Sequence, residues 1–417
     1  MTQLHSFNRR TALAGLAAAP FVTGMSATAQ DRAAIPVAGV VTVYQPNSHA
    51  DVIIGKVLEG WRQDGGRGPD LKLAALYVDQ FPNADMSRRL SKKHGFPITK
   101  TIEEAITLGT KEVQVAGVLS IGEHGSYGYT KDTRQHKYPR RRFFDAIVKA
   151  MGNGGKYVPI FNDKHLAWNW KDGKHMYDTA KRLKIPFMAG SSLPTAWRYP
   201  NTVMPLGAEI EEAIAIGYGG LESYGFHALE TLQCVTERRR GGETGVATVR
   251  AIQGEEIWKA RNRGEWSLDL LQGALATFKK NKLGEGDIRK GLNKNAAFYQ
   301  IGYRDGTKAT VAMCQGLVDQ FALAVKIRGR KQPIVNWFKL EDKPYGHFEH
   351  LLRAIQPMFH TGKPSYPVER TLMTTGILDR AMHSVYRKGK KFSTPELASV
   401  SYKSADWPFA NRGIFSE

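Results

Sequence analysis

Apolar and polar positions follow two different periods along the first half of the chain. Pro36–Tyr44 and Leu71–Val78 are short apolar runs that predict strands, whereas His49–Arg62 carries its apolar residues at helical spacing. The same alternation continues to Phe187–Gly190. Strands that alternate with helices are typical of βαβ units, which build a parallel sheet.

The pattern changes after Trp197–Pro200, where turn dipeptides become frequent. Asp305-Gly306 joins the apolar segments Phe298–Tyr303 and Lys308–Gln315, and this arrangement predicts a hairpin. We therefore predict an α/β protein with a parallel sheet over residues 31–200. A second, α+β domain with a mainly antiparallel open sheet is predicted over residues 201–417.

The first 30 residues differ in composition from both predicted domains. Asn8-Arg9-Arg10 precedes an apolar run over residues 11–19, and Ala27-Thr28-Ala29 has the small residues of a cleavage site. We predict an export signal over residues 1–30 of a bacterial protein that is periplasmic or otherwise exported. The paired arginines are similar to a twin-arginine signal, and an ordinary secretory signal with two chance arginines is the alternative.

The chain has 59 basic and 39 acidic residues, which give a formal net charge of +20. Basic runs such as Arg140–Arg142 and Arg238–Arg240 lie on separate segments, so we interpret them as solvated surface and expect no nucleic-acid partner. No segment is apolar enough to predict a transmembrane span. Export would permit a disulfide between Cys234 and Cys314, but their apolar surroundings favour two buried free thiols.

The order of several motifs resembles one enzyme family over nearly all of residues 36–417. A strand that ends in an acid, Leu73–Asp79, is followed by a helix that ends in His-Gly, Ser87–Gly95, and by a Thr-x-x-Glu segment, Thr101–Glu104. Further along come a strand that ends in Asp-Lys, Tyr157–Lys164, and a helix start with a histidine, Leu221–Glu230. This order is similar to that of the Gfo/Idh/MocA oxidoreductases. The resemblance implies a Rossmann-like dinucleotide-binding domain over 31–200 and a domain for substrate binding or oligomerisation over 201–417.

The resemblance also implies hydride transfer at a secondary alcohol of a sugar or polyol. Lys164 matches the position of the family's catalytic lysine, and His227 matches the histidine that exchanges a proton with the reacting hydroxyl. An imidazole suits that role because its pKa lies near working pH. The alternatives are a surface lysine and a core histidine. We predict no metal, because no recognised ligand spacing is present.

The predicted cofactor is NAD rather than NADP, held tightly because free NAD is scarce outside the cytoplasm. Asp79 follows the second strand, where an acid can bind a ribose diol and repel a 2′-phosphate. All three glycines of the usual phosphate-binding turn are missing, so Tyr44, Asn47 and Ser48 are the candidate contacts there. By the same resemblance, Glu123 and His124 follow the fourth strand near the nicotinamide.

Two other functions remain open at this point. One is the NAD-dependent glycosidase activity of the same family, in which transient oxidation is followed by elimination. The other is a redox-inactive carbohydrate-binding protein that kept the fold and lost the cofactor, which the missing glycines favour. The C-terminal sheet is a candidate surface for a homo-oligomer.

Overall fold

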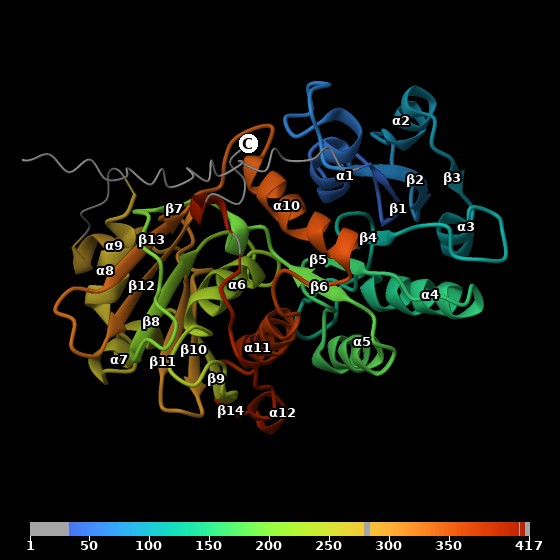
Figure 1. Cartoon of the computed structure of the whole chain (residues 1–417). Helices are drawn as coiled ribbons and strands as arrows, with labels where there is room; N and C mark the ends of the chain where they lie inside the picture. The colour runs from blue at the N-terminus through green and yellow to red at the C-terminus, as the bar shows by residue number, and fades with distance from the viewer. Residues whose placement is uncertain (1–32, 279–283, 408, 413–417) are drawn as a thin grey trace, which may run out of the picture. The chain divides into compact units, whose positions relative to one another are not determined.

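The computed structural model describes residues 33–278, 284–407 and 409–412 (Figure 1). The predicted export signal over residues 1–30 lies outside the described residues and stays a prediction. The chain from Ala34 onward forms one compact unit. None of the helices in the described ranges combines the length and the hydrophobicity that a membrane span requires.

The first sheet is parallel and has six strands in the order β3-β2-β1-β4-β5-β6. Its strands are β1 (Ile35–Val41), β2 (Leu71–Val78), β3 (Ile98–Thr99), β4 (Gly117–Ile121), β5 (Ile160–Asp163) and β6 (Phe187–Gly190). The helices between them are α1 (His49–Glu59), α2 (Ser87–His94), α3 (Ile102–Thr107), α4 (Arg140–Asn153) and α5 (Trp170–Arg182). The chain leaves β1 and β4 in opposite directions, which opens a crevice at their carboxyl ends.

The second sheet has eight strands in the order β14-β9-β10-β11-β8-β12-β13-β7, and β11 with β8 is its one parallel pair. Its strands are β7 (Arg198–Tyr199), β8 (Ile210–Gly217), β9 (Val246–Gln253), β10 (Ala297–Tyr303), β11 (Lys308–Met313), β12 (Phe321–Ile327), β13 (Ile334–Phe338) and β14 (Phe392–Ser393). The predicted fold class is confirmed, and the hairpin at Asp305-Gly306 forms as β10 and β11.

The second sheet buries both of its faces in the middle. Ala213 and Ala215 of β8 face the main core, whereas Ile214 and Ile216 face a second core under α7, α8 and α9. These helices span Glu255–Asn262, Leu268–Leu275 and Glu285–Gly291, and Figure 1 shows them on the side of the sheet away from α6. The predicted oligomer contact through this sheet is untested, and its central strands are already covered.

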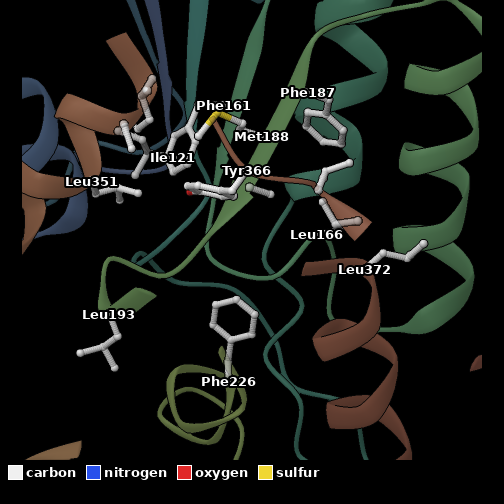
Figure 2. Close-up of a cluster of buried hydrophobic side chains, with 14 of the residues drawn as sticks. Ile121, Phe161, Leu166, Phe187, Met188, Leu193, Phe226, Leu351, Tyr366 and Leu372 are labelled. Carbon is white, nitrogen blue, oxygen red and sulfur yellow. The ribbon is translucent and has the colours of Figure 1, made fainter. Parts of the chain in front are cut away.

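The main core runs without a break from the first sheet into the helices beside the second. These helices are α6 (Gly225–Thr236), α10 (Gly346–Thr361) and α11 (Glu369–Tyr386). The same part of the chain has three short helical segments: η1 (Leu193–Thr195), α12 (Pro395–Ala398) and η2 (Ala410–Arg412). Figure 2 shows Phe161 and Met188 of the first sheet with Phe226, Leu351 and Leu372 of the three helices. This shared core fixes α6 relative to the strand ends.

A buried ion pair ties the end of the described chain to α6. Arg370 donates to both oxygens of Glu237 at 3.0 Å, and both side chains are fully buried. Tyr402 and Trp407 donate to the same carboxylate at 2.9 and 3.1 Å. Glu237 directly follows α6 as its C-cap residue, so this cluster anchors the end of the helix that carries His227.

Two expectations about single residues are tested directly. Cys234 and Cys314 are buried free thiols, as predicted. The interpretation of the basic runs as solvated surface is wrong for Arg140, Arg238 and Arg239, which are at most 5% exposed and pair with acids. For Arg140 the helical spacing carried a signal, because Phe143, Phe144 and Ile147 place it on the buried face of α4.

Candidate active site

A cavity of about 640 Å³ lies at the carboxyl edge of the first sheet, beside the start of α6. The strand ends and the start of α1 contribute His49, Glu123, His124 and Lys164. The segment between β4 and α4 and the region around α6 add Tyr129, Asp132, Thr133, Arg134, His136, Tyr138, Gly220, Leu221, Glu222, Ser223, Tyr224 and His227, and α11 adds Met382, Val385 and Tyr386. The wall therefore combines polar, aromatic and aliphatic side chains.

Lys164 and His227 meet in this cavity, as the resemblance implies. Lys164 Nζ lies 2.8 Å from His227 Nε2 and 3.2 Å from the carbonyl oxygen of Ser223. Lys164 follows β5 directly and is only 3% exposed. Its φ of 68° lies in the left-handed region, which is uncommon for a residue with a Cβ. This backbone conformation turns the lysine towards α6 and away from the strand direction.

The hydrogen bonds of His227 select one tautomer. An ammonium group can only donate, so a charged Lys164 needs the lone pair of Nε2. Nδ1 then carries the proton and donates to Ser191 Oγ, which lies 2.6 Å away. Burial, followed by the charge of Lys164, holds the pKa of His227 well below its usual range. The imidazole is therefore neutral, and its Nε2 accepts from Lys164.

Glu123 compensates the positive charges around the cavity. Its Oε1 lies 3.4 Å from Lys164 Nζ, and its Oε2 accepts a hydrogen bond from Arg140 at 2.5 Å. Burial alone would raise the pKa of Glu123, but Lys164 and Arg140 together hold it well below the usual range. Arg140 also lies 3.0 Å from His165 Nε2, and His165 is 3.2 Å from Glu222. The carboxylate of Glu123 thus stays ionised beside Lys164.

Two further histidines, His49 and His124, line the same cavity as Glu123 and Lys164. His49 is the first residue of α1, and its Nδ1 lies 2.6 Å from Oδ2 of Asp163, the last residue of β5. The rings of His49 and His124 lie 5.4 Å apart. Burial, and after it the charge of His49, lowers the pKa of His124 from 6.5 to about 4.

The His124 shift predicts a loss of stability in mild acid. The unfolded chain binds a proton at this residue as the pH falls through about 6.5, but the folded chain does so only near 4. The contribution of His124 is therefore full above pH 6.5 and is lost as the pH falls towards 4. Urea unfolding at several pH values should show a smaller acid loss for His124→Gln than for the unmodified protein. Equal losses in the two proteins would contradict the assignment.

Asp79 is held by three donors of the chain itself. Tyr77 donates to Oδ1 at 2.7 Å, and Tyr127 and Arg142 donate to Oδ2 at 2.6 Å each. Burial raises the pKa of Asp79, but Arg142 and the two tyrosines lower it below the usual value. Asp79 is an ionised acid directly after β2, where the sequence places it, and its partners are Tyr77 of β2 itself, Tyr127 of the segment between β4 and α4, and Arg142 of α4.

The turn between β1 and α1 uses its N–H groups internally. Ser48 caps α1, because its Oγ accepts from the Asp51 N–H at 3.3 Å. The same Oγ accepts from the Gln45 N–H, and the Asn47 N–H donates to Asp51 Oδ2 at 2.8 Å. The Tyr44 side chain is fully buried in the core, so it does not face the crevice.

The eight predicted site residues thus fall into two groups. Glu123, His124, Lys164 and His227 line one cavity. Tyr44, Asn47, Ser48 and Asp79 lie outside its lining. Sequence reasoning missed His49, Asp163, Arg140 and Ser191, whose side chains complete the polar group.

Several solved structures with a similar fold are described as dehydrogenases or are bound to NAD. A probable dehydrogenase from Thermotoga maritima is 14% identical, with a TM-score of 0.52 over 87% of this chain and 100% of that one. GenD2 from gentamicin A biosynthesis, in complex with NAD, is 12% identical. Its TM-score is 0.55, over 87% of this chain and 97% of that one. A Sinorhizobium meliloti protein described as a myo-inositol dehydrogenase is 13% identical. Its TM-score is 0.52, over 86% of this chain and 99% of that one. No protein-family model and no curated protein matches the chain.

These structural neighbours are Gfo/Idh/MocA-type dehydrogenases. The likeness therefore confirms the fold that the motif order predicted. At such low identity it carries the fold alone, so the chemistry of this chain has to be argued from its own side chains.

Proposed function

We propose that the cavity binds a sugar or polyol and that Lys164 and His227 transfer a proton at one of its hydroxyl groups. The observation that supports this most directly is the 2.8 Å contact between Lys164 Nζ and His227 Nε2 on the cavity wall. A hydroxyl group that inserts between them replaces their direct hydrogen bond, because it donates to Nε2 and accepts from Nζ. Its proton can then pass to the neutral imidazole and back with no change of oxidation state, while the ammonium group stabilises the alkoxide character on the oxygen.

The charges of the site act on this transfer in opposite directions. Burial and Lys164 lower the pKa of His227 and so oppose its protonation. The ionised Glu123, 3.4 Å from Lys164 Nζ, offsets part of that positive charge. Ser191 accepts from Nδ1 throughout, so the ring keeps its orientation when Nε2 takes the proton.

One wall of the cavity offers flat aromatic surfaces. The rings of Tyr129 and His136 are stacked with centroids 4.2 Å apart, and the rings of His136 and Tyr138 lie 3.9 Å apart. Tyr129 is 49% exposed. Aromatic faces beside polar groups suit the C–H faces and hydroxyl edges of a sugar ring.

Hydride transfer to NAD is the reaction that the resemblance implies, but we assign no hydride acceptor to this site. The groups that hold a dinucleotide in this fold are an acid after β2 and free N–H groups at the start of α1. Here Asp79 already accepts from three side chains, and the N–H groups of Gln45 and Asn47 donate to the chain's own atoms. The residues present therefore do not fit the dinucleotide.

Ligand-detected NMR on the full-length protein tests this proposal. The panel contains neutral sugars, inositols, glycosides and keto sugars, and each is followed for binding and for conversion. We expect a member of the panel to bind, and we expect Tyr129→Ala to weaken that binding. Arg88→Ala is the matched control, because Arg88 is exposed and lies away from the cavity lining. A panel without a single binder would overturn the proposal.

A further inference from the structure

We infer that the Gly122–Pro139 segment, which joins β4 to α4, occupies the place that a dinucleotide takes in this fold, so that the cavity works without one. The segment crosses the carboxyl ends of β1 and β2 and then lines the cavity. Three contacts of this segment and of the β1–α1 turn carry the inference, and they do not depend on the proposed reaction.

The first contact covers the position of the adenosine ribose. In dinucleotide-binding folds the acid after β2 accepts from the ribose hydroxyls. Here Tyr127 of the segment donates to Asp79 Oδ2 at 2.6 Å, and Arg142 donates to the same oxygen at 2.6 Å. These two donors make the hydrogen bonds that the ribose would make, and Arg142 also neutralises the carboxylate.

The second contact closes the path between β1 and β2. Ser126 exchanges two hydrogen bonds with the Gln80 side chain, at 2.8 and 2.9 Å. Gly125 lies so close that a Cβ on it would come within 3.1 Å of Val43 and 3.0 Å of Gln80. Thr42 Oγ1 also donates to the Glu123 carbonyl oxygen. Main chain of the segment thus lies directly on the turn that follows β1.

The third contact concerns the pyrophosphate. A phosphate at the start of a helix needs free N–H groups and a positive field. The carboxylate of Asp51 accepts from the Asn47 N–H at 2.8 Å, which places a negative charge at this end of α1. Tyr345, which precedes α10, donates to the Asn47 side chain at 3.3 Å. A diphosphate would meet the Asp51 carboxylate, and the N–H groups of Gln45, Asn47 and Asp51 already donate to side chains of this turn.

The segment gains a different role from this arrangement. Its far half supplies Tyr129, Arg134, His136 and Tyr138 to the cavity wall. The hydrogen bonds from Tyr127 to Asp79 and between Ser126 and Gln80, which we call the tether, hold the segment over the strand ends. The four side chains then face the cavity. The acid that other proteins of this fold use for a cofactor therefore positions a wall for the ligand.

Hydrogen exchange with mass spectrometry on the full-length protein tests the inference. We expect excess NAD⁺, NADH or ADP-ribose to leave exchange unchanged over residues 42–51 and 122–139, and we expect no dinucleotide in the supernatant of the denatured protein. Stoichiometric release of a dinucleotide would overturn the inference. So would protection of residues 42–51 together with faster exchange over 122–139, since the cofactor would then have displaced the segment.

Two variants of the tether give a matched comparison. Tyr127→Phe removes a donor and leaves Asp79 able to accept from a ribose, whereas Asp79→Asn removes the carboxylate itself. If the segment replaces the cofactor, both variants should speed exchange over 122–139, and neither should bind NAD⁺ in calorimetry. If Asp79 is a ribose acceptor, Tyr127→Phe should bind NAD⁺ and Asp79→Asn should not. That second pattern would refute the inference while leaving the sugar-binding test of the proposed function unaffected.

Discussion

Replacing Lys164 by methionine or His227 by glutamine should lower the rate of a redox-neutral conversion of the bound sugar by a factor of about 10²–10⁴, the range of general acid–base contributions. Lys164→Met removes the ammonium group that lies 2.8 Å from His227 and leaves the shape of the side chain nearly intact. His227→Gln removes the proton acceptor and keeps a group that can bond to Ser191. Steady-state rates on the substrate found by NMR measure both effects.

The control for this experiment is Lys174→Met. Lys174 lies on α5 in an exposed pair with Asp178, so its removal should leave the rate unchanged. The pH profile adds a second readout, because a neutral His227 gives activity that persists on the acidic side of the usual histidine range. A fall of less than about tenfold, below the general acid–base range, would assign the replaced residue a structural role.

Replacing Arg370 by methionine should destabilise the protein by about 3–5 kcal/mol, the usual cost of breaking a buried ion pair from one side. The substitution leaves Glu237 fully buried without its bidentate partner, although Tyr402 and Trp407 still donate to it. Urea unfolding followed by tryptophan fluorescence gives the free energy of unfolding. The expected change is large compared with that of an exposed pair.

Arg328→Met is the control, because it removes one partner of an exposed ion pair. Arg328 is 67% exposed and lies beside Glu209 and Glu211, so its removal should change the free energy of unfolding by at most about 1 kcal/mol. Similar effects of the two substitutions would contradict the role assigned to the buried cluster around Glu237.

Much of the first sheet could be predicted because its strands are short apolar runs bounded by helices. Leu71–Val78 and Phe187–Gly190 form strands with the predicted bounds. β8 was not predicted, because Glu211 and Glu212 interrupt its apolar pattern at one end. The apolar run Val113–Ile121 also has the pattern of a strand, but β4 begins only at Gly117, since Val113 and Gln114 precede the sheet.

Part of the site could likewise be predicted from the order of motifs, whereas the rest depends on side-chain directions in the folded chain. Lys164 and His227 are 63 positions apart, and the order of motifs was enough to place them together. The partners of Asp79 could not be foreseen, because Tyr127 and Arg142 reach it from a loop and from the exposed side of a helix. Side-chain direction in a long loop leaves no periodic signal in a sequence.

The cluster around Glu237 has a consequence for how the protein is made. Glu237 ends the helix that carries His227, and its partners Arg370 and Trp407 are synthesised 133 and 170 positions later. A chain grows from its N-terminus, so the Glu237 carboxylate has neither Arg370 nor Trp407 as a partner until the last part of the chain has been made. The first sheet shares its core with α10 and α11, so Lys164 and His227 both reach their final surroundings late in synthesis.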